Sequence, residues 1–328
     1  STGSENISVY KNHFHNFTVV GLGSTTGFNP HNNITINNNT FEEGEVGISS
    51  DAWYSYLTLP NNVKIVDNHF ANITAGVELR TSTLGGVELL GGENYLIARN
   101  VVKNTTNGIF INHNDETYDS LLVEKNNLET KEYGINIRCF EDRITNNRIY
   151  ANNIISEYIA ISITDCGQYY IENNNLTSKE IGIDVYDSGS HIQGNEIMGD
   201  CQDDECKKVS FSKVANIGIS IYDDSEVDIL NNDIGNFYTS IRLLNSEANR
   251  INTNSINFTN TGIYAHGSTL FAQGNHINNS YYAINSELSE LEIENLDIYS
   301  YTTGINSFNS TYDLTSVKMQ EGLICMNF

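Results

Sequence analysis

The chain has 328 residues and a formal charge of −24, with 41 acidic and 17 basic side chains. This acidity disfavours nucleic acid and anionic membrane surfaces as partners, because both repel a negatively charged protein. Only 18% of the residues are charged and apolar residues are evenly spread, so the composition is not that of a disordered chain. No apolar run approaches the ~18 residues that would suggest a membrane span.

Asparagine is unusually abundant and recurs in one short pattern. The pattern is an aliphatic residue, two variable residues, Asn, a variable residue and an apolar residue, as in Ile36-Asn-Asn-Asn39-Thr-Phe41. Its last positions follow one another at nearly constant steps, so one repeat takes about 21 residues. The repeated position falls at Asn12, Asn39, Asn68, Asn100, Asn126, Asn147, Asn174, Asn195, Asn232, Asn254 and Asn275, and then at Leu296 and Val317.

A second motif, a small residue followed by Ile or Val, stands eight residues after most of these positions, as in Gly47-Ile48 and Gly262-Ile263. Residues alternate around it, as in Gly-Ile-Asn-Ile from Gly134, which is typical of strands with one face buried. A repeat of about 21 residues is too short for a strand and a helix. The sequence therefore predicts an all-β, single-stranded, right-handed parallel β-helix solenoid of about 12–13 coils with loop insertions.

The repeated Asn has two physical explanations. A corner between strands needs a residue that tolerates the left-handed conformation, and Asn does so better than most. Stacked amides can also hydrogen-bond from coil to coil as a ladder. We interpret residues 1–328 as a single β-helix domain and as a fragment of a longer chain, because the sequence begins in mid-pattern at Asn6.

This pattern resembles the short repeats of the right-handed parallel β-helices in the pectin-lyase-like superfamily, and the resemblance covers essentially the whole chain. It implies the fold. It does not specify the chemistry, because that superfamily contains lyases, hydrolases, epimerases, phage tailspikes and surface adhesins.

Three insertions follow the small-Ile motif in consecutive coils, at residues 51–60, 81–92 and 113–118, and should form one wall. Aromatic side chains near polar groups suit sugar rings, so this wall is a candidate ligand-binding site. The alternative is that the loops pack on one another and cover the core. The candidate binding residues are Trp53, Tyr54, Tyr56, His113 and Tyr118.

The outward residues of the small-Ile strands give a candidate catalytic patch beside this wall, formed by Asp51, Glu78, Arg80 and Arg138. A lyase resembling pectate lyases needs carboxylates for Ca²⁺ and an Arg or Lys as base, and those residue types are present here. The alternative is that these opposite charges are cross-strand ion pairs. The paired aspartates and Gly-His-Gly motif of polygalacturonases are not found in order.

The cysteines suggest two disulfides, because Cys139 and Cys166 stand at equivalent sites of adjacent coils and Cys201 and Cys206 share one loop. No second Cys or His pair completes a zinc site. Disulfides imply an extracellular or cell-surface location. Ten sequons predict glycosylation at Asn6, Asn16, Asn33, Asn38, Asn72, Asn104, Asn175, Asn257, Asn278 and Asn309.

The leading interpretation is a non-catalytic cell-surface module with a structural, filament-forming or adhesive role, which contacts glycans or neighbouring subunits. Its basis is regularity, acidity, the expected disulfides and the lack of a complete catalytic motif. The first alternative is a polysaccharide-active enzyme, either a Ca²⁺-dependent lyase, an epimerase or a glycoside hydrolase. The second is a protein similar to viral tailspikes. No nucleotide cofactor is expected, because no phosphate-binding motif is present.

Overall fold

A computed structural model describes residues 6–21, 32–51, 61–80, 94–112, 120–139, 147–199, 216–223, 225–247 and 249–327. Within these ranges it describes only the backbone of residues 19–21, 32, 49–51, 61, 78–80 and 112. The described residues form strands and turns without a helix, and no helix in them could cross a membrane. The chain divides into two compact units, Ser1–Tyr170 and Ile171–Phe328, and the division falls inside one strand, β17.

Unit 1 is built from short strands that repeat in every coil. Its strands are β1 (Ser8–Tyr10), β2 (His13–His15), β3 (Val19–Gly21), β4 (Asn32–Asn37), β5 (Thr40–Glu42), β6 (Val46–Asp51), β7 (Asn61–Val66), β8 (His69–Ala71), β9 (Ala75–Arg80), β10 (Tyr95–Ala98), β11 (Val101–Asn112), β12 (Leu121–Glu124), β13 (Asn127–Arg138), β14 (Asn147–Tyr150), β15 (Asn153–Ser156) and β16 (Ile159–Thr164).

Unit 2 repeats the same arrangement. Its strands are β17 (Tyr169–Glu172), β18 (Asn175–Ser178), β19 (Ile181–Tyr186), β20 (Ser190–Gln193), β21 (Glu196–Gly199), β22 (Ile217–Tyr222), β23 (Val227–Leu230), β24 (Asp233–Gly235), β25 (Thr239–Leu244), β26 (Asn249–Asn252), β27 (Ser255–His266), β28 (Thr269–Gln273), β29 (His276–Glu287), β30 (Glu290–Glu294), β31 (Asp297–Phe308), β32 (Thr311–Thr315) and β33 (Lys318–Asn327).

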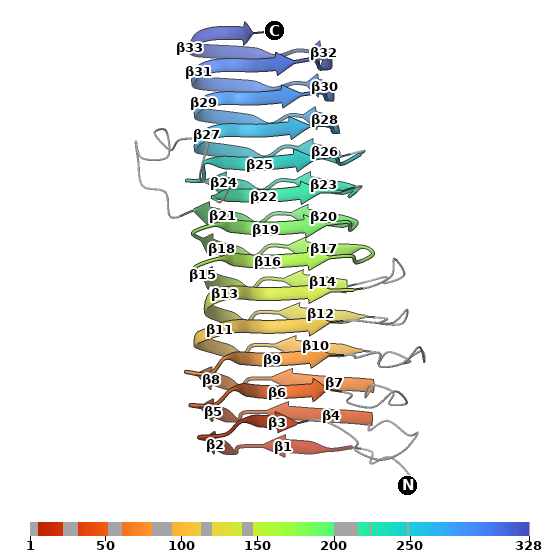
Figure 1. The fold of residues 1–328 in the computed structure, drawn as a ribbon, viewed down its shortest axis with the longest axis vertical. Helices are drawn as coiled ribbons and strands as arrows, with labels where there is room; N and C mark the ends of the chain where they lie inside the picture. Colours follow the sequence, from red (N-terminus) through yellow and green to blue (C-terminus); the bar gives the residue numbers. More distant parts are fainter. Residues whose placement is uncertain are drawn as a thin grey trace. The chain divides into compact units, whose positions relative to one another are not determined.

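Each coil contributes one strand to a sheet that we call the short sheet. In unit 1 its order is β1-β4-β7-β10-β12-β14, and in unit 2 it is β17-β20-β23-β26-β28-β30-β32 (Figure 1). The remaining strands form the long sheet, in which each coil pairs in parallel with the next. One strand per coil gives six coils in unit 1 and seven in unit 2 of the described chain. The predicted parallel β-helix is therefore confirmed.

The core consists of aliphatic columns that run from coil to coil. In unit 2, Ile183 pairs with Ile219, Ile219 with Ile241 and Ile241 with Ile263, and all four side chains are fully buried. The small residue before each Ile is needed for space. A Cβ added at Gly262 would lie 2.5 Å from the carbonyl oxygen of Ala283 on the next coil. This contact explains the second sequence motif, because the chains approach closely at that point.

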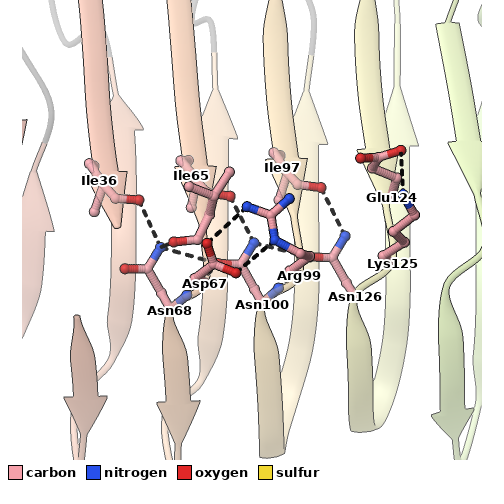
Figure 2. A network of polar contacts seen from close by, with 11 residues as sticks. Ile36, Ile65, Asp67, Asn68, Ile97, Arg99, Asn100, Glu124, Lys125 and Asn126 are labelled. Carbon is pink, nitrogen blue, oxygen red and sulfur yellow. Dashed lines mark hydrogen bonds and ion pairs between the residues drawn. The ribbon is translucent and has the colours of Figure 1, made fainter. Parts of the chain in front are cut away.

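The repeated Asn forms a buried ladder at the corner between the short sheet and the long sheet (Figure 2). Asn100 is representative: its Nδ2 donates to the carbonyl of Ile65 at 2.8 Å and to Oδ1 of Asn126 at 3.0 Å. Its backbone N–H donates to the same Oδ1 at 2.9 Å. The amide thus satisfies backbone groups of both neighbouring coils, which explains why Asn recurs at this corner up to Asn275.

One predicted ladder position is wrong. Oδ1 of Asn152, and not that of Asn147, accepts the bonds from the backbone and side chain of Asn126, both at 3.0 Å. Asn147 instead accepts a bond from the N–H of Leu121. The pair Ala160-Ile161 stands eight residues after Asn152 and obeys the second motif, so the extra residues of this coil precede Asn147.

The left-handed corner residue is also not the ladder Asn. It is the residue immediately before it, with φ of 56° at Asp67, 55° at Arg99, 54° at Lys125 and 53° at Ala151. The side chains of this column are exposed or half-buried, and Arg99 forms an ion pair with Asp67 at 2.7 Å (Figure 2). The ladder position therefore favours Asn for its amide hydrogen bonds. The left-handed conformation of the corner is adopted by the residue before it.

A second ladder, made of serine, was not predicted. It lies at the corner that follows the small-Ile strands of unit 2, where the N–H of Ser246 donates to Oγ of Ser268 and the N–H of Ser268 to Oγ of Ser289, both at 3.2 Å. The hydroxyls of Ser268 and Ser289 donate to the carbonyls two residues earlier, those of His266 at 2.9 Å and Glu287 at 2.8 Å. The hydroxyl thereby repeats, at smaller size, the bridging role of the Asn amide.

The predicted disulfide between Cys139 and Cys166 is present in unit 1, with Cα atoms 4.8 Å apart. Cys166 occupies the serine position of its own coil, because its Sγ lies 3.1 Å from the carbonyl oxygen of Thr164, two residues earlier. A covalent bond between coils thus replaces the serine hydrogen bond at this corner.

Candidate functional site

The outward residues of the long sheet in unit 2 form two parallel rows, which we call the outer rows. The first row contains Asp184, Ser220, Arg242, Tyr264 and Asn285, in register on β19, β22, β25, β27 and β29. The second contains Tyr186, Tyr222, Leu244, His266 and Glu287, two residues further along each strand. Along β19, Asp184 and Tyr186 alternate with Ile183 and Val185, whose side chains are buried in the core. This period-two alternation of each strand determines which residues form the rows.

Asp184 is the one charged residue among the buried side chains of these rows, with 9% of its surface exposed. The hydroxyl of Tyr222 donates a hydrogen bond to its Oδ1, diagonally across two adjacent coils. Burial raises the pKa of Asp184, while this hydrogen bond and the charge of Arg242 act in the opposite direction. Burial and the neighbouring carboxylate also raise the pKa of Tyr222, so its phenol stays protonated at neutral pH.

Arg242 is held in place beside this pair. Its Nη2 and Nε donate to Oγ of the fully buried Ser220 at 2.9 Å and 3.3 Å, and its guanidinium lies 5.6 Å from the ring centre of Tyr222. A cation with a fixed orientation on an open face can bind a carboxylate of a ligand.

Tyr264 and His266 continue the rows on the next coil. Burial and the charge of Glu287 raise the pKa of Tyr264, while Arg242 lowers it. Nδ1 of His266 lies 3.3 Å from Oε2 of Glu287, without the alignment of a hydrogen bond. Arg242, Tyr264 and His266 thus bring an anion-binding group, a phenol and an imidazole to two adjacent coils of one face.

The predicted catalytic patch lies in unit 1, on the equivalent rows. Backbone register places Asp51 beside Arg80, Arg80 beside Asn112 and Asn112 beside Arg138. Glu78 stands in the neighbouring row. Of the four predicted residues only Arg138 has a described side chain, which is exposed and lies 5.9 Å from the ring centre of Phe110. Asp51, Arg80 and Arg138 thus share one row of the backbone register, and the catalytic role of the four residues stays a prediction.

Several predicted residues fall outside the described residues: Trp53, Tyr54, Tyr56, His113, Tyr118, Cys201 and Cys206. All ten sequon asparagines are described. Asn257 and Asn278 are half-buried, and the other eight are exposed.

Calcium belongs to the lyase alternative, through the resemblance to pectate lyases. In the part of the chain that the structure describes, no group of three or more His, Cys, Asp and Glu side chains could hold a metal ion. Asp184 lies beside a cation and a phenol, which do not form an oxygen cage for Ca²⁺. The carboxylates proposed for calcium, Asp51 and Glu78, have no described side chains, so calcium binding there stays a prediction.

Comparison with known proteins gives a fold match alone. No protein-family profile and no curated protein matches the chain. Among solved structures it is similar to the A-module of the mannuronan C-5 epimerase AlgE6 from Azotobacter vinelandii, with 9% identity, a TM-score of 0.42, and coverage of 90% of this chain and 86% of that one. The parallel β-helix itself is shown by the strand register of the two units.

This β-helix is also similar to two GH87 α-1,3-glucanases. One is a catalytic domain in complex with tetrasaccharides, with 11% identity, a TM-score of 0.46, and coverage of 94% of this chain and 64% of that one. The other is the catalytic unit from Streptomyces thermodiastaticus, with 14% identity, a TM-score of 0.36, and coverage of 98% and 64%. At these identities the site must be judged from its own residues.

Proposed function

We propose that this β-helix is a polysaccharide-active enzyme whose catalytic face is the outer rows of unit 2. The observation that carries the proposal is the position of Arg242 between two phenols that stay protonated, next to His266. Arg242 would bind a sugar carboxylate, so the substrate class is a polymer that contains uronic acid. Successive coils are ~4.8 Å apart, and the rows offer polar groups at each step along an extended chain.

The residue types favour abstraction of the proton next to that carboxylate. Arg242 lowers the energy of the negative charge that develops on the carboxylate as the C–H bond breaks. His266 is the candidate base and takes the proton, and Tyr264 is the candidate acid that returns a proton to the sugar. Return to the same carbon from the other face gives an epimer, and return to the leaving glycosidic oxygen gives chain cleavage with a double bond.

Hydrolysis fits these rows less well. Glycosidases use two carboxyl groups about 5–9.5 Å apart. Asp184 and Glu287 stand four coils apart in register, on β19 and β29, which corresponds to roughly 19 Å.

The decisive experiment combines a panel of uronic-acid polymers with variants. Absorbance of the unsaturated product reports lyase activity, and deuterium uptake from D₂O into the polymer reports epimerisation, each with Ca²⁺ or with EDTA. We expect R242A, Y264F and H266A to lower kcat/KM by roughly 10²–10⁴-fold. R148A, an exposed arginine of β14, is the control and should retain activity.

Two results would contradict the proposal. The first is no turnover and no deuterium uptake on any polymer. The second is loss of activity in R80A or R138A with full activity in R242A, which would move the site to unit 1.

A second candidate is a non-catalytic glycan-binding module at the cell surface. Phe308 on β31 stands in register with Glu287 and continues the second row. The observation that favours this candidate is the exposure of aromatic rings along that row, with 36% of Tyr186 and 61% of Phe308 exposed. Saturable binding of a polymer without turnover, weakened in Y186A and F308A, would support this candidate. The Cys139–Cys166 disulfide supports an extracellular location for either candidate.

A further inference from the structure

The two outer rows of unit 2 continue beyond the residues assigned to catalysis. They hold Asn285 and Glu287 on β29, and Asn306 and Phe308 on β31, in register. The strands β27, β29 and β31 follow one another in the long sheet (Figure 1). A polymer that is bound at Tyr264 and extends along the rows therefore reaches β29 and then β31.

The alternation of these strands places the four side chains on the outer face. Along β29, Asn285 and Glu287 alternate with Ile284 and Ser286, which are at most 1% exposed and face the core. The burial pattern of β31 alternates in the same way. A ligand on the outer rows can therefore contact all four side chains.

Positive charge is scarce along this face. Of the described residues that form the rows from β19 to β31, Arg242 alone is a lysine or arginine. Glu287 lies two coils further on, and 43% of its side chain is exposed. A carboxylate of the substrate is attracted at Arg242, whereas a carboxylate on the sugar at β29 meets Glu287 and is repelled.

The first row offers amides on these coils. Nδ2 of Asn306 donates to Oδ1 of Asn285 at 2.8 Å, and Nδ2 of Asn327 donates to Oδ1 of Asn306 at 2.7 Å. All these bonds run in one direction, so the column presents Nδ2 of Asn285 as a donor at the end nearer to Tyr264. An amide donor suits a hydroxyl or carbonyl oxygen of an uncharged sugar.

Phe308 adds an apolar surface next to Glu287. Its side chain is 61% exposed and in register with Glu287 on the adjacent coil. An aromatic ring with this exposure provides contact area for the apolar face of a sugar ring. Asn285, Glu287 and Phe308 thus combine a donor, an acceptor and a flat apolar surface without a cation.

We propose that Asn285, Glu287 and Phe308 form a subsite for a neutral sugar. The substrate of the outer rows is then a heteropolymer in which an uncharged sugar adjoins the uronate bound by Arg242. Nδ2 of Asn285 donates to an oxygen of the neutral sugar, Glu287 accepts from one of its hydroxyls, and the sugar ring packs on Phe308. The inference rests on the proposed function, because Arg242 must hold the uronate.

The test is calorimetric titration of the full chain at neutral pH, in the wild type and in H266A, so that turnover cannot distort the affinities. The alternating probes are tetrasaccharides of hyaluronan, unsulfated chondroitin and heparosan. The homopolymeric probes are tetramers of galacturonate, mannuronate and guluronate. We expect the tightest alternating probe to bind about tenfold more tightly than every homopolymeric probe.

Variants assign this preference to the subsite. We expect E287Q to strengthen binding of the homopolymeric probes by roughly three- to tenfold and to change the alternating probes by less than about twofold. F308A should weaken the alternating probes by roughly three- to tenfold. E290Q changes an exposed glutamate of β30 in the short sheet, so it is the matched control and should leave both affinities unchanged. Melting temperatures establish that each variant is folded.

Three results would overturn the inference: tightest binding of a homopolymeric probe, an equal effect of E287Q and E290Q, or no saturable binding of any probe. Turnover of a homopolyuronate that also binds most tightly would overturn the subsite and leave the catalytic function intact. The expected affinities without turnover of any polymer would support the subsite and contradict the catalytic function.

Discussion

Oδ1 of Asn100 accepts two hydrogen bonds from Asn68, one from its backbone N–H at 3.0 Å and one from its Nδ2 at 3.1 Å. Asn100 in turn donates to Ile65 and Asn126, so one side chain joins three coils. Asn100→Ala leaves the buried N–H of Asn68 and the carbonyl of Ile65 without these partners. We expect it to lower the free energy of unfolding by roughly 3 kcal/mol or more, measured by denaturant unfolding.

The control for the ladder is Asn153→Ala. Asn153 also stacks on an asparagine of the previous coil, with its Nδ2 3.0 Å from Oδ1 of Asn127, but both side chains are exposed. We expect a change within about 0.5 kcal/mol. An equal loss at Asn100 and Asn153 would contradict the argument that burial makes the ladder stabilising.

The residues of positive φ that precede each ladder Asn give two substitutions with opposite effects on stability. Ala151 has a φ of 53°, which costs a residue with a Cβ roughly 1 kcal/mol. Ala151→Gly should therefore stabilise the protein by up to about 1 kcal/mol. Gly194 occupies the same column with a φ of 66°, and a Cβ there would lie 2.7 Å from Oδ1 of Asn173. Gly194→Ala should destabilise by at least ~1 kcal/mol, and thermal unfolding of both variants would show whether the signs differ.

The disulfide gives a prediction that compares two replacements. Cys139 and Cys166 close a loop with a separation of 27 residues, for which chain entropy predicts a loss of roughly 3–4 kcal/mol when the bond is removed. The double Ser variant should lose about 1 kcal/mol less than the double Ala variant, because serine forms ladder hydrogen bonds at this corner in unit 2. Equal melting temperatures for the two double variants would contradict the equivalence of these corners.

Asp184 gives a pH-dependent prediction. Its native pKa is raised above the unfolded value of about 3.9, so the native state binds more protons than the unfolded state between the two values. Its contribution to stability is present below the unfolded pKa and is lost as pH rises through the native pKa. Asp184→Asn removes the ionisable group, so stability is no longer lost at this position as the pH rises. The Asn side chain still has an oxygen that can accept the hydrogen bond from Tyr222.

We therefore expect the melting temperature of D184N to exceed that of the wild type at neutral pH, with a smaller difference or none at about pH 3. D233N is the control, because Asp233 is an exposed aspartate of β24 in the same unit. A difference between D184N and wild type that is the same at both pH values would contradict the assigned cause.

The repeat alone was sufficient to predict the coils, the ladder and the Cys139–Cys166 pair. It failed locally at Asn147, because Asn147 at the start of β14 and Asn152 after β14 both fit the repeated pattern. The rule that the small-Ile motif stands eight positions after the ladder Asn favours Asn152 and would have corrected the error. The serine ladder was missed because Ser188 and Ser268 stand seven residues before their ladder Asn, whereas Ser246 stands eight before.

The candidate site was harder to predict. Register placed Asp184, Tyr222, Arg242, Tyr264 and His266 on the outer face, but it could not distinguish an exposed Asp from a buried one. Burial of Asp184 depends on the side chains of Tyr222 and Arg242 from later coils, and the sequence does not specify their rotamers. The site was predicted in unit 1 because the three consecutive insertions lie there and loops often carry functional residues.

Asn232 and Asn254 occupy the same position on successive coils and make the same contacts: each donates from Nδ2 to an isoleucine carbonyl of the preceding coil, at Ile192 and Ile229, and to Oδ1 of the next ladder asparagine. The segment between two such asparagines therefore contains one complete set of the ladder hydrogen bonds that join a coil to its neighbours. An in-frame duplication or deletion of such a segment would begin and end on matching hydrogen-bond partners, and every later residue would keep its face. Length is thus the property of this protein that genetic change can alter with the least disturbance to the rest.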